Sequence, residues 1–462
     1  MRFHRLEAFR CALSLLLFGT VVFVEAPVSA DDWKAGVAKV NITPKEFMPM
    51  AGYASRDRPA DGKLTDLWAK ALVIDDGNEN RAALVTLDLI GIDRALSVSV
   101  CNSLEQKYGL SRAQVALCTS HTHTGPVVAR NLRPMHFEVL DKKQQKQIED
   151  YSDFLETQII AVVGEAIANH QPSQLSWGSG TSTFATNRRN NPEADVPKLR
   201  EEGKLQGPFD HDVPVLAVRD KDGKLTGVVF GYACHSTVLS FYQWSGDYGG
   251  FAQIELEKAH PNCVAMFWAG CGGDQNPLPR RTVELAMEYG ERLAKAVDKV
   301  LENPMQVVKA KLSSSYQEID LPLDTLPTKE EIEADTKSKN RYIAARAKML
   351  LSEINAGRSL AQTYPYPIQL WRIGEEVQFV ALGGEVVVDY AIRLKSELKG
   401  TQTWVAGYAN DVMAYIPSRR VLREGGYEGG GAMIYYGLPT VWAPEVEKLI
   451  IDEVNRQVSH SP

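Results

Sequence analysis

The stretch 115–126, VALCTSHTHTGP, joins a short apolar run to a polar turn that carries two histidines. The apolar run predicts a buried β-strand, and the pattern at 93–108 before it predicts a helix that leads into that strand. Alternate residues of an extended segment point to the same side, so His121 and His123 are expected to face one pocket. A polar site at the end of a buried strand is thus the first feature of the chain.

Apolar strands and amphipathic helices alternate along the rest of the sequence. Strands are expected at 36–40, 71–74, 81–87, 213–218, 226–233, 264–267, 367–382 and 403–408, and helices at 146–169, 281–302 and 328–355. A capping box at Thr328 opens the last helix, whose polar surface predicts a surface insertion. No internal repeat or low-complexity linker divides the pattern. We therefore expect an α/β fold, with 31–462 forming one large catalytic domain of mixed sheets flanked by helices.

Composition and charge exclude several classes of protein. The 462 residues are 44% hydrophobic and 24% charged, which is ordinary for a globular protein and excludes a disordered or fibrous chain. Lys and Arg number 51 against 58 Asp and Glu, a net charge of -7. Nucleic acids and anionic membrane surfaces attract clustered basic residues. We therefore expect no nucleic-acid partner.

The first thirty residues have the organisation of a signal peptide. Arg2, Arg5 and Arg10 precede an apolar run at 11–24, and small residues follow up to Ala30. The alternative is a membrane anchor, but the run is shorter than the roughly 20 apolar residues that a spanning helix needs. Cleavage after Ala30 would make the mature protein secreted or periplasmic.

The cysteines do not form a disulfide framework. One of the six, Cys11, lies in the expected signal peptide, which leaves an odd number in a long chain. The fold is therefore expected to depend on its hydrophobic core.

Three groups of candidate ligands end apolar strands. A His-x-His pair suits a metal ion because neutral imidazole is a common zinc ligand, although two surface histidines would look the same. His235 follows the strand at 226–233, where a hydrogen-bonded core histidine is the alternative. Glu385 follows two glycines, where a helix cap is the alternative. His136, His170, His260 and His460 are expected at the surface.

The ordered set of motifs resembles the neutral, non-lysosomal ceramidase family. The matching segments are 35–44 (AGVAKVNITP), 121–126 (HTHTGP), Asn187-Arg188, 233–237 (ACHST), Gly273-Asp274, Gly384-Glu385, Tyr415 and 427–429 (YEG). They follow the family's order and span nearly all of the chain after residue 30. The resemblance implies a zinc-dependent amide hydrolase.

The family's residue roles transfer position by position. The resemblance implies one zinc ion per chain, with His121, His235, Glu385 and Tyr415 as its ligands. It places His123 beside the metal, where we expect it to transfer protons. It also implies that Arg188 and Tyr427 contact the substrate or stabilise its oxyanion. Asp88 and Asp247 are candidates to orient the ligand imidazoles, with turn or cap roles as the alternative.

Two departures from the family affect the expected mechanism and substrate. Gly270 stands where the family has a serine, and the neighbouring Cys271 is expected to be a buried small residue rather than a replacement nucleophile. The β-sandwich domain that follows the catalytic domain in the family is expected to be absent here. A metal-activated water is therefore the expected nucleophile.

The sequence thus predicts a secreted zinc amidohydrolase acting on ceramide or a related N-acyl lipid. Its expected partners are this lipid or another N-acyl small molecule, and a lipid substrate would involve peripheral membrane contact. Two alternatives remain open. One is a metal hydrolase acting on an ester or a soluble amide, and the other is an inactive binding protein that retains the pocket.

Overall fold

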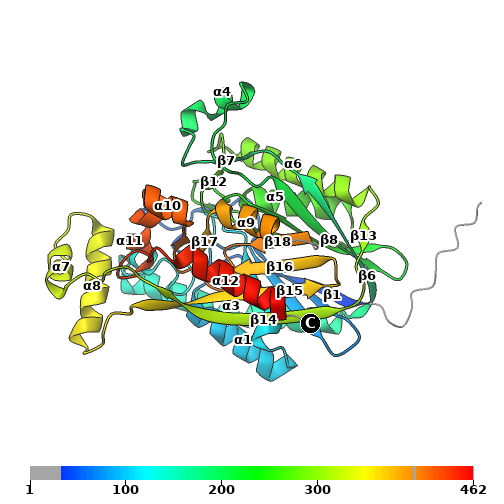
Figure 1. The fold of residues 1–462 in the computed structure, drawn as a ribbon, viewed down its shortest axis with the longest axis horizontal. Helices are drawn as coiled ribbons and strands as arrows, with labels where there is room; N and C mark the ends of the chain where they lie inside the picture. Colours follow the sequence, from blue (N-terminus) through cyan, green and yellow to red (C-terminus); the bar gives the residue numbers. More distant parts are fainter. Residues whose placement is uncertain (1–32, 399–401, 461–462) are drawn as a thin grey trace, which may run out of the picture. The chain divides into compact units, whose positions relative to one another are not determined.

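Two β-sheets pack face to face and helices cover their outer faces in the computed structural model (Figure 1). The structure describes residues 33–398 and 402–460, which all belong to one compact unit, Asp31–Pro462. The expected signal peptide, 1–30, lies outside the described residues. The prediction of a mixed α/β fold is confirmed.

The larger sheet has the strand order β11-β9-β8-β6-β1-β3-β4-β5, with β13 paired to β6. Its strands are β1 (Lys34–Asn41), β3 (Trp68–Asp75), β4 (Arg81–Leu87), β5 (Val115–Thr119), β6 (Gln171–Thr181), β8 (Asp212–Asp220), β9 (Leu225–Tyr232), β11 (Val264–Ala269) and β13 (Gln306–Val307). The second sheet has the order β14-β15-β16-β18. Its strands are β14 (Leu312–Pro322), β15 (Thr363–Ile373), β16 (Val377–Leu382) and β18 (Gln402–Ala406).

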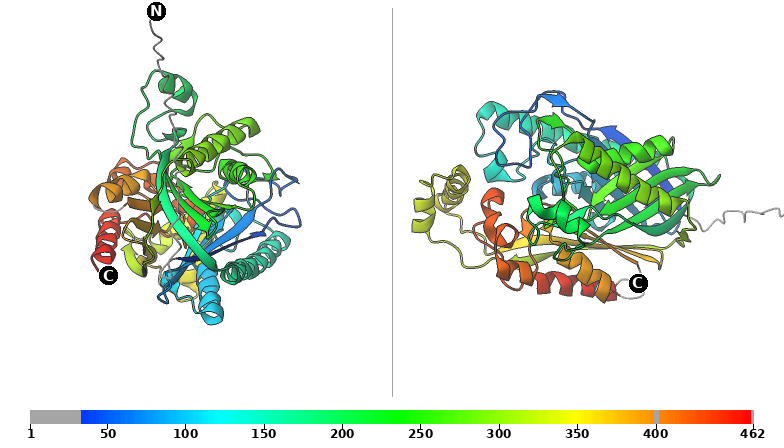
Figure 2. Two further views of the ribbon diagram at one scale, coloured as in Figure 1. Left: turned by 90° about the vertical axis from the view of Figure 1, so that its right-hand side faces the viewer. Right: turned by 90° about the horizontal axis from the view of Figure 1, so that it is seen from above.

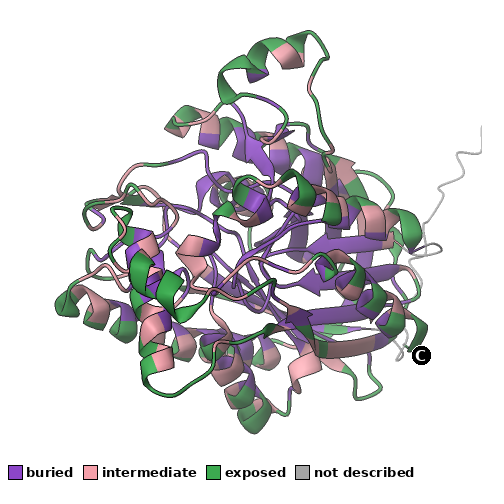
Figure 3. Ribbon diagram, turned by 60° about the vertical axis from the view of Figure 1, so that its left-hand side comes forward, coloured by how far each residue is buried: buried purple, intermediate pink, exposed green. Residues whose placement is uncertain are grey.

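Both faces of the central strands are buried, which explains their continuous apolar sequences. In β3, Leu72 and Ile74 point between the sheets, whereas Ala71 and Val73 point toward the helices. Full burial of a Val, Leu or Ile side chain contributes about 1.5–3 kcal/mol to the free energy of folding. Figure 3 shows the resulting buried interior.

Helices form the outer layers (Figure 2). Helices α1 (Arg94–Tyr108) and α3 (Lys142–Ala168) cover one half of the larger sheet, and α5 (Asp247–Ala259) and α6 (Val283–Leu301) cover the other. The second sheet is covered by α9 (Val388–Glu397) and α12 (Val446–His460). The remaining helices are the short α2 (Arg133–His136), α4 (Val196–Glu201), α10 (Arg419–Glu424) and α11 (Met433–Tyr436), with α7 and α8 described below.

Three strand–helix–strand units carry the polar loops. In each unit the two strands are parallel neighbours: β4-α1-β5, β9-α5-β11 and β16-α9-β18. Ligands of open α/β sheets bind outside the carboxyl ends of such strands. His121, His235 and Glu385 each follow one of these carboxyl ends.

Isolated backbone pairs bring these carboxyl ends together. Thr122 pairs in parallel with Ser236, which joins the loops after β5 and β9. Cys118 pairs with Ala409, and Gly270 pairs with Ala406 at the end of β18. The two edge strands of the larger sheet, β5 and β11, are thereby both joined to the second sheet.

The predicted elements differ from the structure in several places, and the helices α5, α9 and α12 were not predicted. The segment 328–355 is two helices, α7 (Lys329–Asp335) and α8 (Arg341–Asn355), because the Asn340 side chain caps a new helix by accepting from the backbone N–H of Tyr342 and Ile343. The predicted strand at 367–382 is a hairpin of β15 and β16, which turns at Gly374 with φ +65°. The half-exposed strands β6 and β14 were not predicted.

The five cysteines among the described residues are free and buried, as expected for a fold without a disulfide framework. No helix within the described ranges is both long and apolar enough to cross a membrane.

Candidate metal centre

Backbone carbonyls fix the orientation of two buried histidines. His121 Nδ1 lies 2.6 Å from the Ile90 carbonyl oxygen, and His235 Nδ1 lies 2.6 Å from the Gly272 carbonyl oxygen. A carbonyl oxygen only accepts hydrogen bonds, so each Nδ1 carries the proton and donates. In a neutral imidazole this leaves the lone pair on Nε2, which is the atom free to bind a metal ion.

These Nε2 atoms meet a carboxylate and a phenol. Glu385 Oε2 lies 3.2 Å from His121 Nε2 and 3.0 Å from His235 Nε2, and the Tyr415 hydroxyl lies 3.2 Å from His235 Nε2. The short strands β17 (Glu385–Val386) and β19 (Tyr415–Ile416) run parallel and place Glu385 opposite Tyr415. Ligands about 2.0–2.1 Å from a tetrahedral zinc lie roughly 3.3 Å apart. The three observed distances therefore match the separations between ligands of one metal ion.

The electrostatics of this cluster also fit a cation. Burial opposes ionisation of Glu385, but the adjacent imidazoles of His121 and His235 hold the pKa of its carboxyl well below the usual range. Because both Nε2 atoms lack a proton, their lone pairs face the carboxylate oxygen with no hydrogen between them. Glu385 Oε2 correspondingly receives no hydrogen bond from the described residues. A bound cation would satisfy all three atoms at once.

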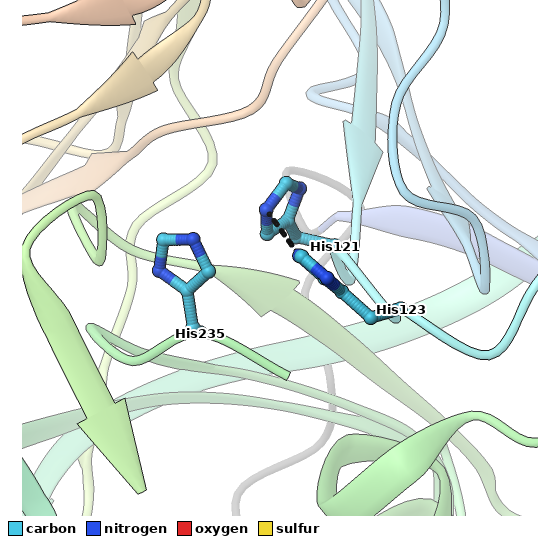
Figure 4. Close-up of side chains that lie close together, drawn as sticks. All are labelled: His121, His123 and His235. Atoms are coloured by element: carbon cyan, nitrogen blue, oxygen red, sulfur yellow. Dashed lines mark hydrogen bonds between the residues drawn. The ribbon is translucent and has the colours of Figure 1, made fainter. Parts of the chain in front are cut away.

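His123 belongs to the same cluster. Figure 4 shows its ring directed toward that of His121, with His235 alongside. Its Nε2 lies 3.1 Å from His121 Nε2, and the three histidines could together hold a metal ion. Burial lowers the pKa of His123 well below its usual value, and the neighbouring His121 and His235 lower it further. Without a bound cation, His123 therefore holds a proton less readily than a free imidazole does.

The loop that holds His123 requires a glycine beside it. Gly52 has φ +100°, and a Cβ there would lie 2.6 Å from the His123 ring. The Arg56 guanidinium donates from Nη2 to the His123 carbonyl oxygen at 2.7 Å. Glycine at 52 and arginine at 56 thus fix the backbone and ring of His123, and no hydrophobic periodicity marks either residue.

Arg188 holds Tyr415 in place. Its guanidinium donates to the Tyr415 hydroxyl at 3.1 Å, to Glu428 at 2.7 Å, to the Gly273 carbonyl at 2.9 Å and to Asn276 at 3.3 Å. Four of the five N–H groups of an arginine are thereby directed at protein atoms. Arg188 is at the site, as expected, but most of its donors are already engaged.

Tyr427 lies at the outer side of the same group. Its ring centroid is 5.3 Å from that of Tyr415, and 47% of the residue is exposed. No described residue is hydrogen-bonded to its hydroxyl. Tyr427 is therefore the predicted substrate-side residue that is free to meet a substrate.

Two further tyrosines contact the ligands and were missed from the sequence. The Tyr436 hydroxyl donates to Glu385 Oε1. The Tyr408 ring stacks on His121, with centroids 4.2 Å apart and planes at 28°. Tyr436 lies in the short helix α11 and Tyr408 in the loop after β18, where no spacing indicates a ligand contact.

The two carboxylates proposed to orient the histidines instead accept hydrogen bonds from backbone N–H groups. Asp88 accepts from the Trp68 backbone N–H at 3.0 Å, and Asp247 accepts from the Leu239 backbone N–H at 2.9 Å. Their turn and cap interpretation is thus the correct one, since carbonyls orient the imidazoles. His136 is also not a surface residue: it is buried and accepts from the Gly52 N–H at 3.0 Å.

The position of the family's serine has no room for a side chain. A Cβ at Gly270 would lie 3.0 Å from Ala233 Cα. The neighbouring Cys271 is buried in the core over the second sheet, and burial raises the pKa of its thiol. Cys271 is therefore an inert packing residue.

The cluster opens into a pocket of about 670 Å³. His123, Arg188, Tyr415 and Tyr427 line it, together with Gly52, Tyr53, Arg189, Asn191, Pro192, Glu193, Thr237, Asn276, Leu278, Arg280, Arg281, Glu424, Gly425, Gly426 and Glu428. Most of these side chains are polar or charged. Of the candidate ligands, Tyr415 lines this solvent-accessible pocket, and His121, His235 and Glu385 are buried beside it.

Known proteins resemble this chain in sequence and fold. Over 92% of its length it is 26% identical to a neutral ceramidase of Pseudomonas aeruginosa, 73% of which is covered. A neutral ceramidase of Drosophila melanogaster is 27% identical over 57% of the chain, which covers 39% of that protein. The crystal structure of the Pseudomonas aeruginosa neutral ceramidase superposes with a TM-score of 0.69 and 22% identity, covering 91% of this chain and 73% of that one. A structure described as ceramidase complexed with C2 gives a TM-score of 0.70 and 20% identity over 91% and 74% of the two chains.

The model of the family described as neutral/alkaline non-lysosomal ceramidase, N-terminal, matches residues 33–277. This match covers more than half of the sequence and includes His121, His123, Arg188 and His235. The chain belongs to the neutral/alkaline non-lysosomal ceramidase family.

Proposed function

We propose that this protein is an exported zinc-dependent amidohydrolase that cleaves the amide bond of ceramide or a related N-acyl lipid. The observation that carries the proposal is the convergence of ligand atoms from the buried His121, His235 and Glu385 next to Tyr415, which lines the pocket. Membership of the ceramidase family supports the amide bond as the target.

The donor set suits zinc better than calcium or magnesium. Two neutral imidazoles, one carboxylate and one phenol offer the nitrogen and oxygen ligands that Zn²⁺ accepts, and a catalytic zinc can take a water as a fifth ligand, whereas Ca²⁺ and Mg²⁺ prefer oxygen alone. When bound, zinc would lower the pKa of a coordinated water toward 7 and make a nucleophile available. His121, His235, Glu385 and Tyr415 would hold it.

The reaction adds water across the amide. The water oxygen bonds to the carbonyl carbon, the carbon–nitrogen bond breaks, and the products are a carboxylate and an amine. His123 borders the pocket and its Nδ1 has no hydrogen-bond partner among the described residues. It would accept the proton of the water and return it to the departing nitrogen.

Two residues would stabilise charge on the carbonyl oxygen. The free Tyr427 hydroxyl is available to donate a hydrogen bond to it. Arg188 would act mainly by positioning Tyr415, because most N–H groups of its guanidinium already donate hydrogen bonds to protein atoms. No protein nucleophile is needed, which agrees with Gly270 and with the buried Cys271.

Hydrolysis by purified protein tests the proposal. Ceramide and simpler N-acyl amines would be incubated with protein treated with chelator and then resupplied with Zn²⁺, and the released amine would be measured. We expect hydrolysis that disappears with chelator and returns with zinc. Chelator-insensitive hydrolysis, or none of any amide, would contradict it. The mass of the exported protein would show whether cleavage follows Ala30.

A further inference from the structure

Arg281 has an uncommon backbone conformation beside the pocket. It lies between β12 (Gln275–Pro277) and α6 with φ +96°, a region that residues other than glycine rarely occupy. Its backbone N–H donates to the Val238 carbonyl oxygen at 2.7 Å, which holds the chain in this conformation. The surrounding structure thus fixes the point from which this side chain emerges.

Arg281 is the charge of the pocket lining that has no partner. Arg188 and Arg189 both pair with Glu428, at 2.7 and 2.6 Å, and Arg189 also reaches Glu424 at 3.1 Å. Arg280 pairs with Glu193 through two nitrogens, the closer at 2.7 Å. Within the described part of the chain, Arg281 forms no ion pair and its guanidinium donates no hydrogen bond. Arg281 is therefore the arginine of the lining whose guanidinium N–H groups remain available to a ligand.

This charge lies close to the candidate metal centre. The Arg281 guanidinium carbon is 5.4 Å from the centre of the Tyr53 ring, and that ring is 4.8 Å from the His123 ring. The Tyr53 hydroxyl donates to the Leu239 carbonyl at 2.9 Å, which keeps the ring in position. One aromatic ring thus separates the guanidinium from His123.

Large exposed hydrophobic side chains are sparse in the lining of the pocket. Among the described residues, the exposed large hydrophobic side chains are Phe47, Phe209, Ile254, Met287, Val307, Ile392 and Tyr427. Only Tyr427 lines the pocket. The polar lining and the unpaired guanidinium therefore favour a substrate with a charged group.

We propose that the pocket selects amides that carry a carboxylate, such as N-acyl amino acids, and that Arg281 binds this carboxylate. The proposal rests on the amide hydrolysis proposed above and specifies its substrate class. The planar guanidinium of arginine matches a carboxylate with two parallel hydrogen bonds. Arg281 would then be a specificity-determining residue rather than a catalytic one.

A matched pair of substrates tests the proposal. N-octanoylglycine and N-octanoylethanolamine share the acyl chain and the amide, and differ in a carboxylate against a hydroxyl. We expect the zinc-loaded wild-type protein to have a kcat/KM about tenfold higher or more for N-octanoylglycine, mainly through KM. Arg281→Gln should abolish this preference by lowering kcat/KM for the glycine compound alone.

Control variants separate a specific role from a general one. Arg419→Gln removes an exposed arginine whose side chain has no recorded contact and which does not line the pocket, so the preference should persist. Arg281→Lys retains the positive charge but not the planar guanidinium, and should retain part of the preference for N-octanoylglycine. Thermal unfolding would check that Arg281→Gln is folded, as expected for an exposed side chain without an ion pair.

The outcomes distinguish this proposal from the proposed function. Equal hydrolysis of both amides by the wild type, or an equal loss for both in Arg281→Gln, would overturn the carboxylate proposal and leave amide hydrolysis standing. Hydrolysis of no amide, including ceramide, by zinc-loaded protein would overturn both.

Discussion

The Tyr436 hydroxyl donates a hydrogen bond to Oε1 of Glu385, the carboxylate whose other oxygen faces His121 and His235. This contact leaves Oε2 to face the two imidazoles and fixes the rotation of the carboxyl group. Partners that orient metal ligands typically contribute 10–100-fold to metal affinity or activity. We expect Tyr436→Phe to weaken zinc binding by about this factor, measured by competition with a chromogenic chelator. Unchanged affinity in the folded variant would show that Tyr436 only fills space.

Removal of a ligand histidine should empty the metal site. Protein purified without added metal is expected to contain one zinc ion per chain by elemental analysis. His121→Ala should lose most of it, because Nε2 of this residue is an unprotonated donor. His460→Ala is a control, since His460 is exposed at the end of α12. Full zinc occupancy in His121→Ala would remove His121 from the ligand set.

The hydroxyl of Tyr427 should matter to the rate. If it donates to the developing oxyanion, Tyr427→Phe should lower kcat and kcat/KM together by about 10²-fold with zinc retained. A packing role would instead reduce the free energy of unfolding and leave kcat nearly unchanged. A zinc-replete variant with normal kcat would exclude Tyr427 from catalysis.

Thiol reagents should leave the activity intact. All five cysteines that the structure describes are buried, and burial raises the pKa of Cys271, so little reactive thiolate is present. Iodoacetamide is expected to spare amide hydrolysis, measured before and after treatment of the native protein. Inactivation of the wild type that is absent in Cys271→Ala would indicate a nucleophilic thiol.

A buried carboxyl should make stability depend on pH. Burial raises the pKa of Asp411 to about 7, and its carboxylate accepts from the Tyr364 hydroxyl at 2.7 Å. Between its unfolded pKa near 4 and this value, the folded chain keeps a proton that the unfolded chain has released. The contribution to stability is therefore present at low pH and lost as the pH rises through about 7.

The variant Asp411→Asn isolates this effect. Asparagine keeps the shape and an acceptor for Tyr364 but does not titrate. Wild-type protein should lose about 3 kcal/mol of unfolding free energy from this group between pH 5 and pH 8, and the variant should not. Urea unfolding at both values in chelator measures the difference. Identical pH dependence of the two proteins would contradict a raised pKa for Asp411.

The sequence allowed prediction of the strand ends whose polar side chains converge, because apolar strands are conspicuous and polar residues directly follow them. His121, His235 and Glu385 were found in this way. The groups that orient them could not be found, since the carbonyls of Ile90 and Gly272 belong to the backbone and have no residue signature. Tyr436 was missed because only the packing of α11 brings it to Glu385.

The missed strands have a related explanation. β6 and β14 are partly exposed along their length, so their sequences lack the apolar runs that marked the central strands. The break between α7 and α8 depends on the cap at Asn340, which interrupts a pattern that otherwise continues. Local hydrogen bonds, rather than hydrophobic periodicity, decide these features.

The donor groups of the metal centre come from loops distributed along most of the chain. During translation His121 is synthesised early, whereas Tyr415 and Tyr436 are synthesised near the end of the 462 residues. The candidate metal site is complete only when the last of these segments has docked. A copy that is terminated early or cut before Tyr415 therefore lacks part of this site even if its first sheet has formed. Hydrolytic activity in this protein is thus coupled to the completion of its synthesis.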